Sequence, residues 1–323
     1  MISSCLLELC SEFQELLRSV CAKSHGESIL LSGGLDSSIL LNYMHPREAI
    51  TISVDQHSSD YLYSTLVAKK YAINHNIVMP TMKTIIDNLD ELVRDFKSFD
   101  PIFLRNSVVQ LLGFKEAKRL KVNTIILGDG ADELFGGYNF LGKYLKTPDI
   151  LQTKLNKIVQ NMEFVSFTFS KKYDLGITTP FLDDTIIKFS QSLSVNEKIA
   201  MHKRIIYGKF FLRSCFRDML GDEIAWRRKE ALESGSGINK IIPYLEECIT
   251  DTDFLEGYRR AQNEGVSIRT KEQMFYYQIY RKFFDPPIYQ ICDRPDKSKR
   301  CPSCNIIFNW KGSFCKTCGA YPV

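Results

Sequence analysis

Two glycine-rich turns, each directly after a short apolar run, constrain the fold of this chain more than any other feature. Residues 32–38 read Ser-Gly-Gly-Leu-Asp-Ser-Ser and follow an apolar run at 29–31. Residues 128–138 read Gly-Asp-Gly-Ala-Asp-Glu-Leu-Phe-Gly-Gly-Tyr and follow a second apolar run at 124–127. Each pattern predicts a strand, a tight turn and a helix with an Asp near its start. Two such turns at one edge of a sheet would form a phosphate cradle with two carboxylates for a metal.

Short β-rich runs alternate with helical patterns in the first part of the chain. The strands are expected at residues 28–31, 49–54, 76–79 and 124–127, and the helices at 37–43, 59–71, 82–96 and 106–119. This alternation predicts an α/β fold with a parallel sheet covered by helices on both faces. Right-handed crossovers would place both glycine turns at the carboxyl edge of that sheet.

The remaining segments predict a helical extension and a separate tail. Residues 4–22 have an amphipathic helical pattern, and so do residues 205–220 and 272–284, while β signals fade after about residue 140. We therefore expect a main domain at 1–292, with its sheet core at about 1–145 and its helical part at about 146–292, a polar linker at 293–300, and a cysteine-rich module at 301–323.

The composition is that of an ordinary globular protein. Of the 323 residues, 44% are hydrophobic and 25% are charged, and the net charge of +4 is too small to indicate a nucleic-acid partner by itself. No run approaches the roughly 18 uncharged apolar residues of a membrane span, and no signal peptide is evident, so the cytoplasm is the expected location. In that compartment, the six cysteines outside the tail are expected to be small buried apolar side chains.

The first glycine turn resembles the signature of ATP pyrophosphatases with the adenine nucleotide alpha-hydrolase-like, Rossmann-like fold. The motif has no Gly-Lys-Ser or Gly-Lys-Thr, which excludes a Walker-type loop. Members of that group cleave ATP between the α and β phosphates. The resemblance implies that ATP or pyrophosphate is bound by Ser32, Gly33, Gly34, Asp36, Ser37, Ser38, Val54 and Gly128.

The second turn resembles the corresponding segment in the synthetase domain of class B asparagine synthetases and their relatives. Three weaker elements of that family follow in the same order: Arg-Asn-Ser at 105–107, Pro-Phe-Leu-Asp at 180–183, and Trp-Arg-Arg-Lys-Glu at 226–230. The resemblance spans roughly residues 1–285. It implies an ATP-dependent ligase that converts a carboxylate, by default aspartate, to an acyl-adenylate with release of pyrophosphate and then aminates it.

The resemblance also implies a role for each motif residue. Magnesium would be held by Asp36 and Asp132, because Mg²⁺ prefers one or two carboxylates plus phosphate oxygens. Lys229 would stabilise the oxyanion of the amination step, although a basic run such as 227–229 is also typical of a solvated face. The base that accepts the proton of ammonia would be Asp129 or Glu133, although an acid in the first turn such as Glu133 is equally typical of one that stabilises its helix. Substrate binding would fall to Arg105, Ser107 and Asp183.

The chain departs from the family pattern in two places. Residues 1–27 are too few for the glutaminase domain of class B enzymes, so ammonia is expected from solution or from a separate glutaminase partner. Thr178 and Thr179 stand before Pro180, where the family usually has an Arg, so one carboxylate clamp is missing.

The tail carries two Cys-x-x-Cys pairs, Cys301 with Cys304 and Cys315 with Cys318. Four thiolates at this spacing predict a structural zinc ribbon, since a module this small cannot bury enough core alone. The ribbon could contact RNA or protein, and the basic residues at 297–300 with Trp310 favour RNA mildly; a solvated basic linker is the plainer interpretation.

Two other functions are consistent with part of the sequence. An RNA- or tRNA-modifying ATP pyrophosphatase would share the first turn and use the ribbon to grip RNA, but it does not account for residues 128–138 or 226–230. A nucleotide-binding regulatory protein without chemistry would not need Asp36, Asp132 and Lys229.

Overall fold

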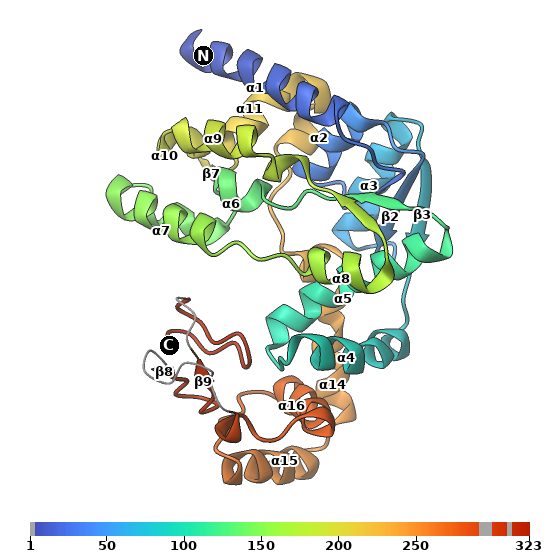
Figure 1. Ribbon diagram of the computed structural model, residues 1–323, viewed down its shortest axis with the longest axis vertical. Helices are drawn as coiled ribbons and strands as arrows, with labels where there is room; N and C mark the ends of the chain where they lie inside the picture. The colour runs from blue at the N-terminus through green and yellow to red at the C-terminus, as the bar shows by residue number, and fades with distance from the viewer. Residues whose placement is uncertain (1–3, 291–298, 309–311) are drawn as a thin grey trace. The chain divides into compact units, whose positions relative to one another are not determined.

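The computed structural model describes residues 4–290, 299–308 and 312–323, and these fall into two compact units (Figure 1). Unit 1 consists of residues 1–78 and 112–231, and unit 2 of residues 79–111 and 232–323. Most of the predicted linker, including residues 297 and 298, lies outside the described residues, and so does Trp310.

Unit 1 contains the sheet and the helices that cover it. Its elements are α1 (Ser4–Ala22), β1 (Ser28–Leu30), α2 (Leu35–Met44), β2 (Glu48–Ile52), α3 (Ser59–Lys70), β3 (Asn74–Val78), β4 (Thr124–Ile126), α6 (Ala131–Phe135), η1 (Asn139–Tyr144), α7 (Pro148–Gln160), α8 (Val165–Tyr173), β5 (Gly176–Thr178), η2 (Pro180–Leu182), α9 (Asp184–Ser192), α10 (Val195–Lys198), β6 (Ile199–His202), β7 (Ile205–Gly208), α11 (Phe210–Leu220) and α12 (Asp222–Ala225).

Unit 2 is largely helical. Its elements are α4 (Met82–Phe96), the first part of α5 (Pro101–Arg119), α13 (Leu232–Gly235), η3 (Ile238–Lys240), α14 (Ile241–Cys248), α15 (Asp251–Asn263), α16 (Lys271–Phe283), η4 (Pro287–Tyr289), β8 (Lys299–Arg300) and β9 (Ile307–Phe308). Among the described residues, no helix has the length and apolarity needed to cross a bilayer.

The main sheet confirms the predicted parallel α/β architecture. Its five strands are all parallel and lie in the order β3-β2-β1-β4-β5. The chain first moves outward from β1 to β3 and then returns to the other side of β1 with β4. The order therefore reverses between β1 and β4, which is the switch point where open α/β sheets bind their ligands. Both glycine turns leave the sheet at this point, one after each strand.

Four of the described strands, β5, β6, β7 and β8, fall in segments where the sequence predicted helix or no strand. The fifth strand, β5, is short and starts with a glycine, so it has little β character of its own and is stabilised by pairing with β4. The predicted helix at 205–220 is wrong at its start, because residues 205–208 form β7, which pairs with β6 in an antiparallel hairpin. The helix itself, α11, begins at Phe210.

An aromatic cluster centred on α1 packs against α6, in the second glycine turn, and against α11. Phe13 is fully buried, and its ring centroid lies 5.4 Å from that of Phe135 in α6 and 5.4 Å from that of Phe211 in α11. Cys10 and Cys215 add a covalent link between α1 and α11. The expectation that all scattered cysteines are unpaired apolar side chains is therefore wrong for these two, because the fold brings α1 against α11.

Replacing Phe13 with Ala should destabilise the protein by about 3–5 kcal/mol, because the large cavity left in this cluster cannot collapse fully. The same change at Leu7, which is 56% exposed on the same helix, should cost less than about 1 kcal/mol. Chemical denaturation of both variants checks this, and equal losses would mean that the cluster does not hold α1 in place.

Candidate active site

The first glycine turn connects β1 to α2 and leaves the N-terminus of α2 open. Gly34 occupies the N-cap position, where no side chain caps the helix, so backbone N–H groups remain available for an anion. Gly33 has a φ of +67°, and a Cβ there would lie 2.2 Å from the backbone carbon of Tyr63. Only glycine fits this position, because α3 crosses directly behind the turn.

The predicted nucleotide-binding residues cluster at this sheet edge. Ser32 and Ser37 have their hydroxyl oxygens 3.5 Å apart across the turn. The Ser38 hydroxyl is buried and has no hydrogen-bond partner among the described residues. Val54 follows the end of β2 at the same edge, half-buried, and Gly128 follows β4. A Cβ on Gly128 would lie 3.0 Å from Cβ of Asp36, so the two turns are in direct contact.

The two predicted magnesium ligands are joined by a lysine that the sequence analysis did not single out. Lys209 lies between β7 and α11, and its side chain is only 3% exposed. Its ammonium group lies 2.5 Å from Oδ2 of Asp36 and 2.7 Å from Oδ1 of Asp132. Lys209 belongs to no recognised motif in the sequence, and its left-handed φ of 53° became evident only in the structure.

Lys229 completes this group of charges. Its ammonium group lies 3.1 Å from Oδ2 of Asp132, and about a third of its side chain is exposed. Burial alone would lower the pKa of Lys229, but Asp132 and Asp36 outweigh that effect and raise it, so the side chain is a cation. Burial would likewise raise the pKa of Asp132, yet Lys209 and Lys229 hold it well below its usual range.

The basic run at 227–229 is not a uniform solvated face. The Arg227 guanidinium is buried and donates to the Ser32 carbonyl at 2.8 Å and to the Asp60 carboxylate at 2.7 Å. Arg228 is exposed, whereas Lys229 reaches the carboxylates. Three consecutive basic residues therefore have three different environments, and Arg227 ties this segment to the first glycine turn.

A second buried arginine fixes the backbone of the same segment. Arg213 of α11 donates from Nη1 to the carbonyl of Ala225 at 2.7 Å and to that of Arg227 at 2.8 Å. Asn139 donates to the Lys229 carbonyl at 3.1 Å. The position of Lys229 is thus set by side-chain hydrogen bonds to the carbonyls of Ala225, Arg227 and Lys229 itself.

The two candidate bases lie on the second glycine turn with raised pKa values. Burial raises the pKa of Asp129 from 3.8 to about 6, although Ser166 donates a hydrogen bond to its Oδ2 at 2.5 Å. Burial also raises the pKa of Glu133, which accepts a hydrogen bond from the Tyr138 hydroxyl at 2.5 Å. Both carboxyl groups can therefore exchange a proton closer to neutral pH than an exposed acid can.

The predicted substrate residues do not all fall in the unit that holds the charged cluster. Asp183 caps α9 by accepting a hydrogen bond from the Thr185 N–H at 2.8 Å. Arg105 and Ser107 belong to unit 2, where both are buried on α5. The Arg105 guanidinium already contacts Glu233 at 2.6 Å and Glu272 at 2.6 Å.

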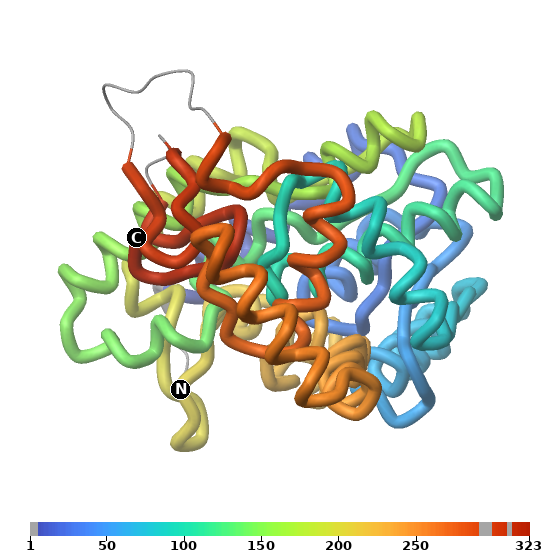
Figure 2. The backbone as a smooth tube through the Cα atoms, turned by 90° about the horizontal axis from the view of Figure 1, so that it is seen from below, coloured from blue at the N-terminus to red at the C-terminus, as the bar shows by residue number. Residues whose placement is uncertain are grey.

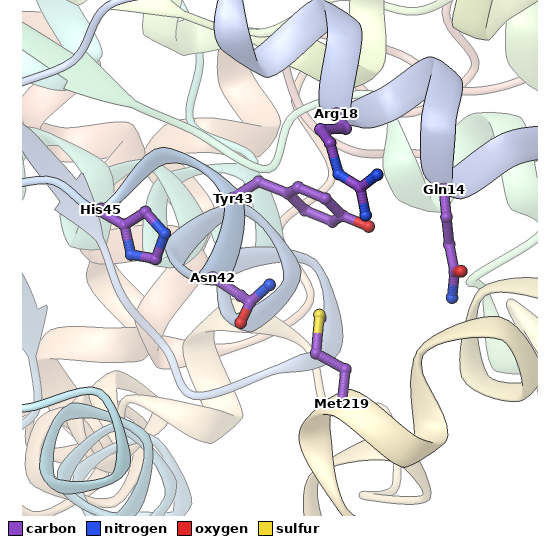
Figure 3. A pocket seen from close by; sticks show the side chains of 6 residues that line it. All are labelled: Gln14, Arg18, Asn42, Tyr43, His45 and Met219. Atoms are coloured by element: carbon purple, nitrogen blue, oxygen red, sulfur yellow. The ribbon is translucent and has the colours of Figure 1, made fainter.

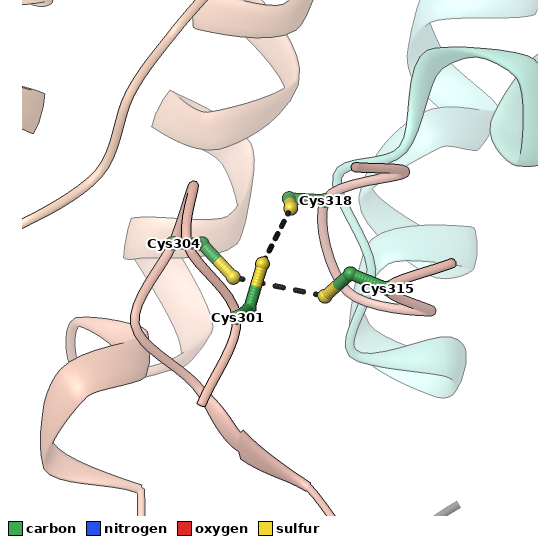
Figure 4. Close-up of side chains that lie close together, drawn as sticks. All are labelled: Cys301, Cys304, Cys315 and Cys318. Atoms are coloured by element: carbon green, nitrogen blue, oxygen red, sulfur yellow. Dashed lines mark hydrogen bonds between the residues drawn. The ribbon is translucent and has the colours of Figure 1, made fainter. Parts of the chain in front are cut away.

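The cysteine module forms the predicted four-sulfur cluster in unit 2 (Figure 4). Its members are buried, their sulfurs lie within 4.8 Å of one another, and they are Cys301, Cys304, Cys315 and Cys318. The Cys301–Cys318 and Cys304–Cys315 sulfur separations are 3.6 and 3.8 Å. Four thiolates around a tetrahedral zinc with bonds of about 2.3 Å would lie about 3.8 Å apart, so the residues fit that ion.

A pocket of about 480 Å³ lies in unit 1 (Figure 3). It lies at the C-terminal end of α2, whereas Asp36 is at the N-terminal end of that helix. It is lined by Gln14, Arg18, Asn42, Tyr43, His45 and Met219. None of the predicted site residues is among these, and both Arg18 and His45 are exposed. The charged cluster at the switch point, rather than this open hollow, is therefore the candidate active site.

Replacing Lys209 with Met should destabilise the protein without ligands by about 3–5 kcal/mol, because it removes the cation that bridges Asp36 and Asp132 and leaves only Lys229 beside Asp132. The matched change at Lys203, which is 74% exposed and 4.0 Å from Asp222, should have almost no effect. Thermal melts of both variants check this. If Mg²⁺ restores much of the stability of the Lys209 variant, the two carboxylates form a cation site; equal melts for both variants would contradict the bridging role.

Comparison with known proteins identifies the family. The family model described as asparagine synthase matches residues 18–175 and 169–300. Asparagine synthetase B [glutamine-hydrolyzing] of Escherichia coli is 23% identical, over 96% of this chain and 59% of that protein. Asparagine synthetases of Triphysaria versicolor and Lotus japonicus are 25% and 27% identical, over 53% and 47% of their lengths.

A solved structure from Methanocaldococcus jannaschii, described as a predicted subunit of tRNA methyltransferase, matches with 13% identity and a TM-score of 0.30. It covers 61% of this chain and 89% of its own, and a TM-score this low does not indicate a shared fold. The curated relatives are longer, and this chain spans about half of each relative named above, between 47% and 59% of its length. With the family model matching nearly its whole length, the chain belongs to the asparagine synthase family.

Proposed function

We propose that this protein is an ATP-dependent amide-forming ligase of the asparagine synthetase type. The observation that carries the proposal is the cluster of Asp36, Asp132, Lys209 and Lys229 at the switch point of the sheet. A carboxylate substrate would be activated as an acyl-adenylate there, and ammonia would then displace AMP. Family membership supports ATP as the nucleotide.

In the first step, a carboxylate oxygen of the substrate attacks the α-phosphorus of ATP. The bond from that phosphorus to the bridging oxygen breaks, and pyrophosphate leaves with the bonding electron pair. Negative charge builds on the pyrophosphate, and the open N-terminus of α2 together with Lys209 and Lys229 is suited to stabilise it. The cluster is the part of the structure best matched to this need.

Asp36 and Asp132 have the chemistry of magnesium ligands. The Oδ1 atom of Asp36 is buried and has no hydrogen-bond partner among the described residues, as expected for an oxygen that binds a cation. A bound Mg²⁺ would neutralise phosphate charge. Asp36 and Asp132 would hold the metal, and Lys209, which lies between them, would add a second positive charge beside the phosphates.

In the second step, ammonia attacks the acyl carbon, the carbon–oxygen bond to AMP breaks, and one proton must leave the nitrogen. Lys229 is the proposed donor to the oxyanion that forms. Asp129 is the proposed base and Glu133 the alternative, because both lie on the second turn and have raised pKa values.

Aspartate is the proposed default substrate, and ammonia from solution or from a glutaminase partner is the proposed nitrogen donor. Both rest on the family, since the residues before Pro180 are Thr178 and Thr179 rather than an arginine.

We further propose one structural zinc ion in the four-cysteine cluster, and a main domain at 1–292 followed by the ribbon. The cytoplasm remains the predicted location, although a disulfide such as Cys10–Cys215 is rare in a reducing compartment.

The proposal is tested by incubating the protein with ATP, Mg²⁺, ammonium and a panel of amino-acid and dicarboxylic acids. Release of AMP and pyrophosphate with aspartate, together with asparagine as the product, is the expected result. If AMP release instead requires tRNA and no free carboxylate, the proposal is wrong and an RNA-modifying function takes its place.

Replacing Lys229 with Ala should lower kcat by at least about 10²-fold, because the developing oxyanion loses its charged donor. The neighbouring Arg228→Ala change is the matched control, since that side chain is exposed and should leave kcat within about twofold. Steady-state assays of pyrophosphate release compare the two. Similar rates for both variants would remove Lys229 from the catalytic group.

The pH dependence tests Asp129 as the base. Its folded-state pKa of about 6 lies above the ordinary 3.8, so the proton-accepting form is present only above about pH 6. At a fixed concentration of unprotonated ammonia, amide formation should rise up to about pH 6 and then level off. The same shift means that this group's contribution to stability falls as pH rises from about 4 to 6.

The variant Asp129→Asn should abolish that rise and lower the rate by about 10²–10⁴-fold. This control is needed because burial, outweighing Arg227, also raises the pKa of Asp60 to about 6. A full rate with an unchanged profile in Asp129→Asn would exclude Asp129 as the base, and Glu133→Gln would then be measured in the same way.

A further inference from the structure

The second cysteine knuckle of the ribbon is hydrogen-bonded to the segment that leads into α5. The Thr317 carbonyl accepts hydrogen bonds from the Phe99 N–H at 2.7 Å and from the Ser98 hydroxyl at 3.3 Å. Gly319 lies against Asp100 so closely that a Cβ there would be 2.4 Å from a carboxylate oxygen. The chain path at the start of α5 is thus fixed by backbone groups of the ribbon.

The same knuckle also contacts α16 and the loop before it. The Cys318 carbonyl accepts hydrogen bonds from Arg269 at 2.9 Å and from the Gln273 side chain at 3.0 Å. Gln273 is fully buried, so this bond is shielded from water. Figure 2 shows the C-terminal segment running beside α16, in agreement with these bonds.

The first knuckle adds a separate attachment. The Ser303 carbonyl accepts a hydrogen bond from the Ser267 N–H at 2.6 Å, and the Asn305 side chain donates to the Gly265 carbonyl at 2.6 Å. Both knuckles are therefore bonded to unit 2 mainly through main-chain groups, whose positions depend on the knuckles being folded.

The two elements clamped by the ribbon carry the partners of a buried ion pair. Arg105 lies in the second turn of α5, a few residues after Phe99, and Glu272 lies next to Gln273 at the start of α16. Arg105 Nη1 is 2.6 Å from Glu272 Oε2, and both side chains are at most 8% exposed. Tyr276 donates a further hydrogen bond to Glu272 at 2.8 Å.

We infer that the four-cysteine ribbon is a zinc-dependent staple that holds α5 and α16 together at the Arg105–Glu272 pair. A module of this size has almost no core of its own, so its folding energy comes from the metal. When the metal is lost, the carbonyls of Thr317 and Cys318 lose their fixed positions, and the start of α5 is released. The ribbon is thereby a positioning element for Arg105, a residue with a predicted role in substrate binding.

This inference rests on the proposed zinc site, and its main readout does not depend on ligase activity. Metal analysis should find one zinc per chain in the wild type. Hydrogen exchange of peptides covering residues 98–107 and 268–275 should accelerate by at least about tenfold in Cys315→Ser or after removal of zinc by a chelator. Cys248→Ser is the matched control, because Cys248 is an exposed free cysteine outside the cluster, and it should leave exchange unchanged.

A second variant separates docking from metal binding and covers the case in which Cys315→Ser unfolds the whole chain. The double change Arg269→Ala and Gln273→Ala removes both donors to the Cys318 carbonyl without touching a metal ligand. It should retain one zinc and still accelerate exchange in both peptides. Unchanged exchange in this variant, or after zinc removal, would overturn the staple.

Two further measurements define what the ribbon positions. In turnover, the double variant should raise KM for the carboxylate more than it lowers kcat; faster exchange with an unchanged KM would retain the staple but overturn its connection to the substrate through Arg105. A gel-shift assay with tRNA tests whether the ribbon binds RNA instead. Zinc-dependent RNA binding without any change in hydrogen exchange would replace the staple with a nucleic-acid role.

Discussion

Two carboxylates at the same edge of a sheet repel each other unless a cation lies between them, and Lys209 is that cation in this protein. The repulsion arises from the topology, because adjacent parallel strands β1 and β4 send their turns, with Asp36 and Asp132, to one place. Lys209 can bridge them only because the β6–β7 hairpin ends there and its backbone adopts a left-handed φ. The switch point therefore depends on an element encoded about 70 residues after the second turn.

Glycine at position 137 shows how closely this bridge is built. A Cβ there would lie 1.8 Å from Oδ1 of Asp132 and 2.5 Å from Cε of Lys209. The aromatic cluster of Phe13, Phe135 and Phe211 supports two helices: α6, which carries Asp132, and α11, which begins directly after Lys209. Rigid backing of this kind keeps charged groups in place before a ligand arrives, which is what electrostatic stabilisation of a transition state needs.

The parts of the fold that the sequence predicted are those in which local signals agree with the tertiary structure. The strands before each glycine turn, the helix α4 at Met82–Phe96 and the four-cysteine cluster all have strong local patterns. The strand β5 was missed because a short segment with a glycine has no β preference until β4 pairs with it. Lys209 was missed for a related reason: its role comes only from what lies opposite it in space.

The basic run at 227–229 is a second case in which the sequence alone could not predict which side chains are buried. No property of the sequence distinguishes Arg227, which is buried against Asp60, from Arg228, which is exposed. Burial of a guanidinium requires partners for several N–H groups at once, and the Ser32 carbonyl and Asp60 are such partners. Those acceptors come from the first glycine turn and from α3, so their meeting with Arg227 is a property of the folded chain.

The charge balance around Arg105 bears on the choice of substrate. A single guanidinium is in contact with the two carboxylates of Glu233 and Glu272, and Tyr276 donates a hydrogen bond to the same oxygen of Glu272, Oε1, that Arg105 contacts at 2.7 Å. An incoming carboxylate would have to share this guanidinium with two glutamates, which already contact its Nε and Nη1. Arg105 is therefore shared between two glutamates before it meets any further anion. Thr178 and Thr179 also stand where the family usually has an arginine before Pro180, which makes a panel of monocarboxylic substrates as informative as aspartate.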